Sequence, residues 1–219
     1  MRVVCVKHGD KYGDEWVVNL HRMVERNLPI PHEFVCITEK PVDGINCIPL
    51  LCEHGGWWQK IGLFKPGALP GDNLYLDLDI VITDSLLPLV ALLYKSPGLW
   101  ARDDPSYSLR NPRRGLSADE IRMLGGPGCV NSSVMLWKDD VARAVWDEFT
   151  PGVMEIMHGD QNWLSHVLWP DTIRFIPDHM ASSYKYHVQR GEPPAPIVIF
   201  HGHPKQNEVC DQWVREHWR

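Results

Sequence analysis

The chain has 219 residues, of which 44% are hydrophobic and 23% are charged, as in an average globular protein, so a disordered or collagen-like chain is excluded. This length predicts a single domain over residues 1–219. Acidic residues outnumber basic ones by 28 to 22, giving a formal net charge of −6, which argues against binding to nucleic acid or to an anionic membrane because both favour a basic surface.

Short apolar runs alternate with helical patterns along the chain. Strands are expected at Val3–Val6, Phe34–Ile37, Ile45–Ile48, Leu74–Thr83, Gly98–Ala101, Ser133–Trp137, Ile173–Ile176 and Ile197–Phe200. Helices are expected from a cap at Asp14 to Leu28 and over Trp57–Phe64, Ser85–Tyr94, Val141–Phe149, Asp160–Leu168 and Glu208–Trp218. This alternation predicts an α/β fold with a central, mostly parallel sheet and helices on both faces. Ligands of such sheets bind beyond the carboxyl ends of the strands.

Three features bear on organisation and location. The polar segment Arg102–Gly128 is expected to form a lid or a plain surface insertion. The six cysteines include no CxxC pair, which argues against structural zinc, and Cys5 and Cys36 lie in apolar runs typical of buried free thiols. The first apolar run is too short for a signal peptide, and no run approaches the roughly 20 residues of a membrane span. A cytoplasmic protein with no transmembrane segment is therefore expected.

Asp77 and Asp79 interrupt the apolar run Leu74–Thr83. Alternate residues of a regular strand point to the same face, so the two carboxylates would lie side by side, where they repel each other and lose hydration. A divalent cation relieves both costs, because hard cations prefer oxygen ligands. The alternative is a solvated pair at the end of a strand, since a chain of this composition contains about one Asp-x-Asp by chance.

A second polar segment, His201-Gly-His-Pro-Lys205, follows the strand expected at Ile197–Phe200. A neutral His201 would complete a metal shell begun by carboxylates, and Lys205 would act as a point charge on a phosphate. The third residue of the turn, His203, is a less favoured ligand because its side chain is expected to point outward. The alternative is a surface turn with solvated histidine and lysine.

Together these two segments resemble the GT-A fold glycosyltransferases, and among them the glycogenin-like enzymes of the family eight type. In that family an Asp-x-Asp at a strand end and a late His-Gly…Lys element share one Mn²⁺ and the donor diphosphate. Three weaker matches lie in the same order as in the family, at the Lys-bearing Trp57–Phe64, at the Asn-Ser strand Cys129–Leu136 and at the Gly-Asp-Gln segment Gly159–Leu164. The resemblance extends from the first strand to about Lys205.

The resemblance implies a metal-dependent glycosyltransferase that moves a sugar from a nucleotide-diphosphate sugar, in first place a UDP-sugar, to an unidentified glycosyl acceptor. It implies that Mn²⁺ or Mg²⁺ is held by Asp77, Asp79 and His201, and that Asp77 also contacts the ribose. A bound metal would neutralise the charge that builds on the leaving diphosphate.

The same resemblance implies the other site residues. The donor would be bound by Lys7, Tyr12, Asn131 and Lys205, and the residues at the transferred sugar would be Lys60, Asp160 and Gln161. Three of these have an ordinary alternative: Tyr12 as a surface residue, Asn131 as a strand-entry residue and Asp160 as a helix N-cap. The paired Trp57 and Trp58 would either line an acceptor site or belong to the core.

Two other functions stay open. A sugar-1-phosphate nucleotidyltransferase uses a related sheet, but it needs a Gly-rich phosphate loop after the first strand, and Lys7–Lys11 is a poor match. An inactive carbohydrate- or nucleotide-binding protein would need no metal–diphosphate site, so the presence of Asp77, Asp79 and His201 argues against it. The net charge of −6 itself conflicts with an anionic donor, and a bound metal would remove that conflict.

Overall fold

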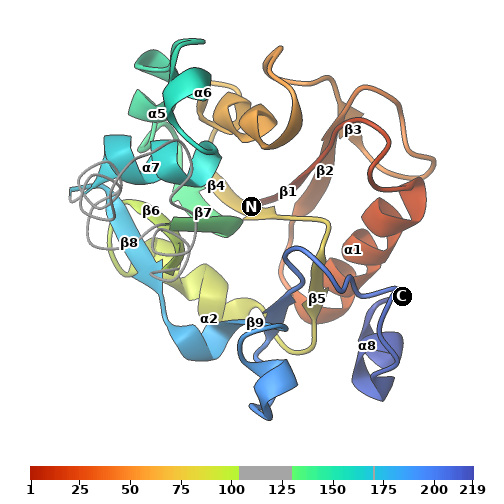
Figure 1. The fold of residues 1–219 in the computed structure, drawn as a ribbon. Coiled ribbons are helices and arrows are strands. Elements are labelled where there is room, and N and C mark those ends of the chain that lie inside the picture. Colours follow the sequence, from red (N-terminus) through yellow and green to blue (C-terminus); the bar gives the residue numbers. More distant parts are fainter. Residues whose placement is uncertain (104–129, 170) are drawn as a thin grey trace.

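The computed structural model describes residues 1–103, 130–169 and 171–219, which form two sheets surrounded by helices (Figure 1). The larger sheet has seven strands in the order β3-β2-β1-β4-β7-β6-β8. These strands are β1 (Arg2–Lys7), β2 (Glu33–Thr38), β3 (Cys47–Ile48), β4 (Asp72–Leu76), β6 (Leu99–Asp103), β7 (Val130–Lys138) and β8 (Ile173–Ile176). Among these described strands, only β7 runs antiparallel to its neighbours, β4 and β6. The expected α/β fold with a mostly parallel sheet is confirmed.

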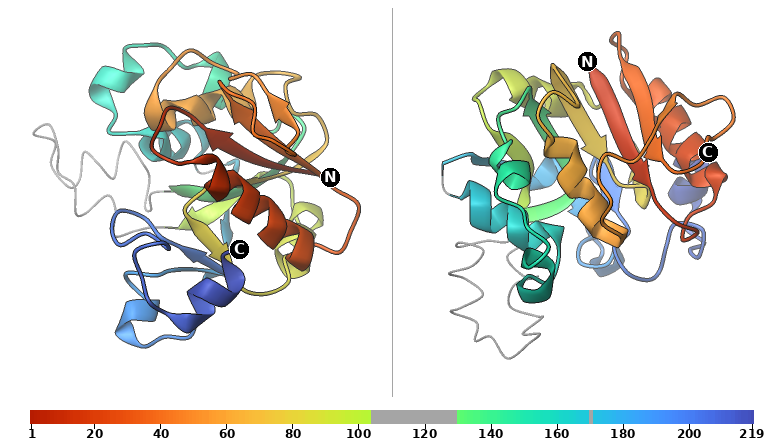
Figure 2. Two further views of the ribbon diagram at one scale, coloured as in Figure 1. Left: turned by 90° about the vertical axis from the view of Figure 1, so that its right-hand side faces the viewer. Right: turned by 90° about the horizontal axis from the view of Figure 1, so that it is seen from above.

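A second, three-stranded sheet has the order β5-β10-β9, formed by β5 (Ile80–Ile82), β10 (Ile197–Ile199) and β9 (Ala181–Ser183). The α-helices are α1 (Asp14–Asn27), α2 (Leu87–Val90), α5 (Ala144–Asp147), α6 (Val153–Ile156), α7 (Asp160–Leu168) and α8 (Gln212–His217). The 3-10 helices are η1 (Gly56–Phe64), η2 (Ala91–Tyr94), η4 (Asp178–Met180) and η5 (Val188–Arg190). Figure 2 shows the second sheet and α8 on one side of the larger sheet and α5 to α7 on the other.

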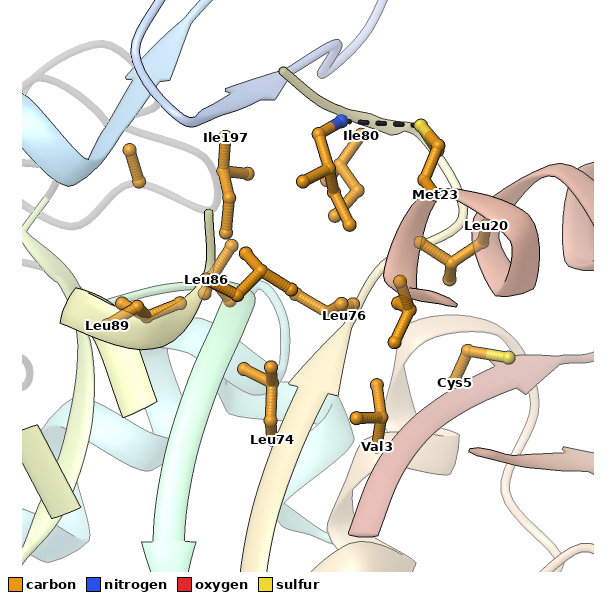
Figure 3. Close-up of a cluster of buried hydrophobic side chains, with 14 of the residues drawn as sticks. Val3, Cys5, Leu20, Met23, Leu74, Leu76, Ile80, Leu86, Leu89 and Ile197 are labelled. Carbon is orange, nitrogen blue, oxygen red and sulfur yellow. Dashed lines mark hydrogen bonds between the residues drawn. The ribbon is translucent and has the colours of Figure 1, made fainter. Parts of the chain in front are cut away.

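The hydrophobic core occupies both faces of the larger sheet, as alternating side chains show. Leu74 and Leu76 of β4 belong to one buried cluster, and Tyr75 between them belongs to another. The first cluster fills the space between this sheet, α1 and the second sheet, and Met23 of α1 and Ile197 of β10 both point into it (Figure 3). The second cluster lies under η1, α5 and α7. Burial of one such side chain contributes about 1.5–3 kcal/mol, so the clusters on both faces stabilise the larger sheet.

The run expected as one strand, Leu74–Thr83, forms two strands in two different sheets, β4 and β5. Between them, the amide of Asp77 donates to the carbonyl of Ser133 at 2.9 Å, which continues the pairing with β7. The carbonyl of Asp79 accepts from the amide of Phe200 at 2.8 Å, which begins the pairing with β10. The prediction of a single regular strand is therefore wrong, because the backbone changes its hydrogen-bonding partner within this turn.

Several helices differ from the sequence prediction. The segment Trp57–Phe64 belongs to the 3-10 helix η1 rather than to an α-helix. Asp14 is the first residue of α1 rather than its cap, since Gly13 takes the cap position and the carboxylate of Asp14 pairs with Lys7 at 3.1 Å. Regular α-helix is shorter than predicted in the segments Ser85–Tyr94, Val141–Phe149 and Glu208–Trp218. Capping and local turns decide such ends, and apolar spacing does not report them.

Other predictions concern the cysteines and the polar segment. Cys5 and Cys36 are buried free thiols, as predicted. Of the expected lid or insertion, Arg102 and Asp103 belong to β6, where they pair with Asn131 and Val130 of β7, and residues 104–128 lie outside the described residues. In the described part of the chain, no helix has both the length and the apolar character needed to cross a membrane.

Candidate functional site

A pocket of about 420 Å³ opens where β1 and β4 end and β7 begins. Because β7 is antiparallel to β4, its first residues reach the same edge of the sheet as the carboxyl end of β4. The wall is completed by the starts of η1 and α7 and by the turn after β10. Its polar lining consists of His8, Lys11, Tyr12, Lys60, Tyr75, Asp77, Asp79, Asn131, Ser133, Asp160, Gln161, His201 and Lys205.

One half of the pocket is built around Lys60, which is only 8% exposed. Its ammonium lies 2.8 Å from Asp77 Oδ1, donates to Ser132 Oγ at 3.0 Å, and lies 3.8 Å from Asp160 Oδ2. The hydroxyl of Ser132 in turn donates to Asp160 Oδ2 at 2.5 Å. We call Lys60, Asp77, Ser132 and Asp160 the Lys60 cluster. In this cluster one buried ammonium lies beside two carboxylates.

The charges of the Lys60 cluster shift one another's pKa values. Burial raises the pKa of Asp77, but the charge of Lys60 and hydrogen bonds from Lys60 and Tyr75 outweigh it and leave that pKa below its ordinary value. Burial lowers the pKa of Lys60, and the charges of the two aspartates more than compensate, so it ends above its ordinary value. At Asp160 burial prevails over Lys60 and Ser132, and its pKa is raised. Asp77 is therefore the firmly ionised member and Asp160 the more easily protonated one.

The other half of the pocket is built around Lys205, which joins the turn after β10 to Asp79. The ammonium of Lys205 donates to Asp79 Oδ2 and, at 2.7 Å, to the carbonyl of Phe200. Tyr12 donates its hydroxyl to the same Asp79 oxygen at 3.0 Å, and burial together with the charge of Asp79 raises the pKa of that phenol. We call Tyr12, Asp79 and Lys205 the Lys205 cluster. It contains one ammonium for one carboxylate.

The three residues expected to ligate metal, Asp77, Asp79 and His201, all line this pocket. Two carboxylates and an imidazole are donors that Mn²⁺ or Mg²⁺ accepts, so the donor set fits such an ion in kind. The described residues do not, however, gather three ligating side chains closely enough to hold one. Each carboxylate is bound by a lysine, and His201 Nε2 lies 2.6 Å from Ser183 Oγ.

The remaining site predictions differ in placement. Gly159 is the cap of α7 and Asp160 is the first residue of the helix, so the N-cap alternative is wrong. Asn131 lines the pocket and also accepts from the Ser133 amide at 3.0 Å, which combines the binding position with the strand-entry role. Gln161 lines the pocket, and its amide oxygen is buried without a hydrogen-bond partner in the part of the chain that the structure describes.

Lys7 and His203 do not take part in the lining. Val6 and His8 line the pocket, and Lys7 between them points to the other side, as alternation along a strand requires. Lys7 pairs with Asp14 there, and its expected contact with the nucleotide base stays a prediction. The side chain of His203 is 80% exposed and meets Glu208 at 2.9 Å, so the expected outward orientation is confirmed.

Sequence reasoning missed three residues that support the site. Tyr75 is 1% exposed and donates its hydroxyl to Asp77 at 2.6 Å, a contact that the two-residue spacing could have indicated. Ser132 bridges Lys60 and Asp160; the resemblance included it in the Asn-Ser strand but gave it no role. Gln206 is 2% exposed and donates to the carbonyl of Leu78 at 3.0 Å, which fixes the turn between the two aspartates.

Comparisons with known proteins connect this geometry to a fold. No protein-family model matches the chain, and no curated protein matches it by sequence. The structure of the galactosyltransferase LgtC, with donor and acceptor sugar analogs, matches over 94% of this chain and 89% of its own, with a TM-score of 0.67 at 16% identity. The chain has the GT-A glycosyltransferase fold.

Other solved structures share the GT-A fold with similar agreement. The glycosyltransferase GlyE of Streptococcus pneumoniae TIGR4 matches 99% of this chain and 58% of its own, with a TM-score of 0.64 at 15% identity. Mouse xyloside xylosyltransferase 1 matches over 95% of this chain and 99% of its own, with a TM-score of 0.64 at 10% identity. At these identities the likeness concerns the backbone, and the side chains of the pocket have to be interpreted on their own chemistry.

Proposed function

We propose that this protein is a glycosyltransferase that uses a nucleotide-diphosphate sugar, in first place a UDP-sugar, and a divalent cation to glycosylate an acceptor. The observation that carries the proposal is the pocket itself, which combines the Lys60 cluster with the Lys205 cluster at the carboxyl edge of the sheet. The substrate class is supported by the GT-A fold and by the LgtC structure, which is a complex with donor and acceptor sugar analogs.

The charge of the pocket explains how an acidic chain could accept an anionic donor. Three lysines, Lys11, Lys60 and Lys205, and three aspartates, Asp77, Asp79 and Asp160, line it. The pocket is therefore balanced locally although the chain carries a net charge of −6. Local charge decides binding at contact distance, because salt screens distant charges over about 10 Å.

The Lys205 cluster is suited to the diphosphate. An ammonium has three donors, and among the described residues Lys205 uses one on Asp79 and one on the carbonyl of Phe200. The third is available to a phosphate oxygen, and Lys11, whose ammonium lies 4.9 Å from the Tyr12 ring centroid, adds a second cation nearby. Charge-assisted hydrogen bonds of this kind stabilise negative charge on the leaving diphosphate.

The Lys60 cluster is suited to the transferred sugar. The three donors of Lys60 are already taken by Asp77, by Ser132 Oγ and by the Ser132 carbonyl at 3.3 Å. We therefore assign Lys60 to positioning the carboxylates rather than to contacting phosphate. With two carboxylates for one ammonium, this half favours the positive charge that develops on a sugar carbon as its bond to the leaving group breaks.

Asp77, Asp79 and His201 would hold the cation, with Asp77 also near the ribose. A bound divalent ion supplies Lewis-acid neutralisation of the leaving diphosphate. Lys205 and Tyr12 both donate to Oδ2 of Asp79, so if this oxygen served as the ligand, Lys205 would exchange the carboxylate for another anion. A donor phosphate is the anion that the spare N–H group of Lys205 would already contact. Asn131 would form a hydrogen bond with a sugar hydroxyl, in addition to the one that it accepts from the Ser133 amide.

Asp160 and Gln161 would orient hydroxyls of the transferred sugar or of the acceptor. A buried amide oxygen without a partner costs free energy, and a ligand hydroxyl with a small rotation of the amide would satisfy it. A second solved structure of LgtC is an active-site mutant in which a glutamine is replaced by glutamate. An active-site glutamine in a protein of the same fold supports a role for Gln161 at the substrate. We assign to Gln161 a contact to a hydroxyl of the substrate.

The proposal is tested with Asp79→Asn, which keeps the size of the side chain and removes its charge. Hydrolysis or transfer is measured with a panel of UDP- and GDP-sugars and Mn²⁺, and UDP binding is measured by calorimetry with and without Mn²⁺. We expect Asp79→Asn to lower turnover by about 100-fold or more and to abolish the metal dependence of UDP binding. Asp10→Asn is the matched control, because Asp10 lies on the neighbouring loop with a side chain that is 97% exposed.

Three outcomes would count against the proposal. Turnover that survives in Asp79→Asn would remove Asp79 from the mechanism. Metal-dependent UDP binding without turnover of any donor would favour the inactive binding protein. Turnover of a nucleoside triphosphate with a sugar 1-phosphate would favour the nucleotidyltransferase instead.

A further inference from the structure

Trp57 is an exposed indole at the rim of the pocket. It is 52% exposed, whereas its neighbour Trp58 is 8% exposed and belongs to the core. The other large hydrophobic side chains that the described residues expose are Leu87, Tyr94, Val141 and Ile156, and none of them lines this pocket. An indole that is half exposed loses about 1 kcal/mol or more of the stabilisation that full burial would give. A function at this position would explain that loss.

The local backbone places the Trp57 side chain above the Lys60 cluster. In a 3-10 helix the side chains of residues three apart are eclipsed, so Trp57 and Lys60 share one face of η1. Lys60 lies at the buried end of that face, and Trp57 lies at the rim. The indole is thus aligned with the half of the pocket that the proposed function assigns to the sugar.

Contacts with the start of α7 hold the indole in place. A Cβ atom on Gly159 would lie 3.1 Å from Nε1 and 3.4 Å from Cδ1 of Trp57. Gly159 has an extended backbone that any residue adopts, so the indole explains the missing side chain better than the backbone does. The ring of His158 lies 6.0 Å from the Trp57 ring, at an angle of 46°. The indole is therefore seated against the segment that leads into Asp160 and Gln161.

We propose that Trp57 is the stacking platform for a pyranose ring of a carbohydrate acceptor. The apolar C–H face of a pyranose suits an aromatic face, and its hydroxyls suit the few polar groups beside it. Here those groups are Asp160 and Gln161, the first two residues of α7. This inference rests on the proposed function, because the acceptor is the second substrate of a glycosyltransferase.

The acceptor is a better occupant than the donor nucleotide. The cations suited to a diphosphate, Lys11 and Lys205, gather around the ring of Tyr12, at 4.9 and 5.9 Å from its centroid. Trp57 lies instead beside Gly159 and the ring of His158, the two residues that precede Asp160 in the chain. A donor whose phosphates meet Lys205 and whose sugar meets the Lys60 cluster leaves the rim at Trp57 for the second substrate.

The experiment uses the full chain with UDP and Mn²⁺ present and measures binding of methyl glycopyranosides, of the gluco, galacto, xylo and manno series, by saturation-transfer NMR. We expect at least one to bind wild-type protein, and Trp57→Ala to raise its Kd about ten-fold or more, with a smaller effect in Trp57→Phe. The Kd of UDP, measured by calorimetry in the same variants, is expected to change much less. Tyr94→Ala is the control for an exposed aromatic outside this pocket.

Each result decides the proposal. Absence of glycoside binding to wild-type protein overturns it, and so does binding that Trp57→Ala leaves unchanged. Equal weakening of UDP and glycoside binding overturns it in favour of a donor contact. Trp57→Gln, which keeps a long side chain without an aromatic face, replaces Trp57→Ala if the latter melts at a lower temperature than wild type. Failure of the proposed function would be distinct, because donor turnover by wild-type protein would then be missing while glycoside binding could persist.

Discussion

The two halves of the pocket solve the same electrostatic problem in different ways. In the Lys60 cluster a saturated ammonium holds two carboxylates, and its members come from η1, β7, the end of β4 and the start of α7. In the Lys205 cluster an ammonium with one spare donor holds a single carboxylate, between the turn after β10 and the loop after β1. The comparison teaches that two similar Lys–Asp pairs can have different roles. The Lys60 cluster is a fixed structural part of the pocket, and the Lys205–Asp79 pair is a contact that a ligand can exchange.

The largest expected effect comes from breaking the fixed half. Lys60→Met leaves Asp77 and Asp160 buried without a cation, and we expect a loss of about 3–5 kcal/mol in the free energy of unfolding near pH 7. Chemical denaturation measures it. Lys40→Met is the control, because Lys40 pairs with Asp10 at 3.7 Å on the surface and such pairs contribute about 0–1 kcal/mol. Equal losses of stability in the two variants would show that the Lys60 cluster is not a structural part of the pocket.

The pH dependence sharpens the same comparison. The folded-state pKa of Asp77 lies below its ordinary value, so the pair contributes stability above about pH 4, the unfolded-state pKa, and loses it as the pH falls through the lower folded-state pKa. In Lys60→Met the aspartates can protonate in the folded protein and relieve the cost. The stability difference from wild type is therefore expected to be largest near neutral pH and to shrink in acid. A difference that grows in acid would contradict this account.

A smaller loss of stability is expected from the exchangeable half. Lys205→Met leaves only Asp79 without its cation, and Tyr12 still donates to that carboxylate, so we expect a loss of about 2–3 kcal/mol. UDP binding without metal should weaken in this variant, since the spare N–H donor is lost with the ammonium. Calorimetry on Lys205→Met and Lys60→Met together tests the assignment. Weaker UDP binding in a folded Lys60→Met than in Lys205→Met would reverse the roles of the two halves.

The smallest effect is expected from Tyr12→Phe. It removes one hydrogen bond to Asp79 and keeps the ring, so the loss of stability should be about 1.5 kcal/mol. If Tyr12 also stacks on the nucleotide base, as the resemblance implies, then Tyr12→Phe should leave UDP binding nearly intact, whereas Tyr12→Ala should weaken it. Calorimetric titration with UDP compares the two variants. Equal binding by Tyr12→Ala and wild type would exclude stacking.

Alternating apolar runs predicted most strands of the larger sheet, but not the short strand β9 of the second sheet. The polar strand ends and the resemblance together predicted Asp77, Asp79, Asp160, His201, Lys60 and Lys205, which all line the pocket, whereas the predicted Lys7 does not and the lining residues His8 and Lys11 were not predicted. The sequence could not predict that the backbone changes sheets between Asp77 and Asp79, since the apolar residues continue on both sides of the break. The resemblance placed Lys60 and Asp160 in one site, but it did not show that Lys60 pairs with Asp160 or that Ser132 links the two, because these residues lie far apart in the chain. An eight-residue run such as Trp57–Phe64 also does not distinguish a 3-10 helix from an α-helix, although residues three apart, such as Trp57 and Lys60, share a face in both.

The turn from Asp77 to Asp79 is the covalent link by which β4 in the larger sheet continues into β5 in the second. Each aspartate is hydrogen-bonded through its backbone to a different sheet, the first to Ser133 and the second to Phe200. The backbone that carries the two carboxylates is therefore coupled to the position of one sheet against the other. A pair of spectroscopic labels, one on each sheet and remote from the pocket, would report a movement of the two sheets at this turn without altering either aspartate.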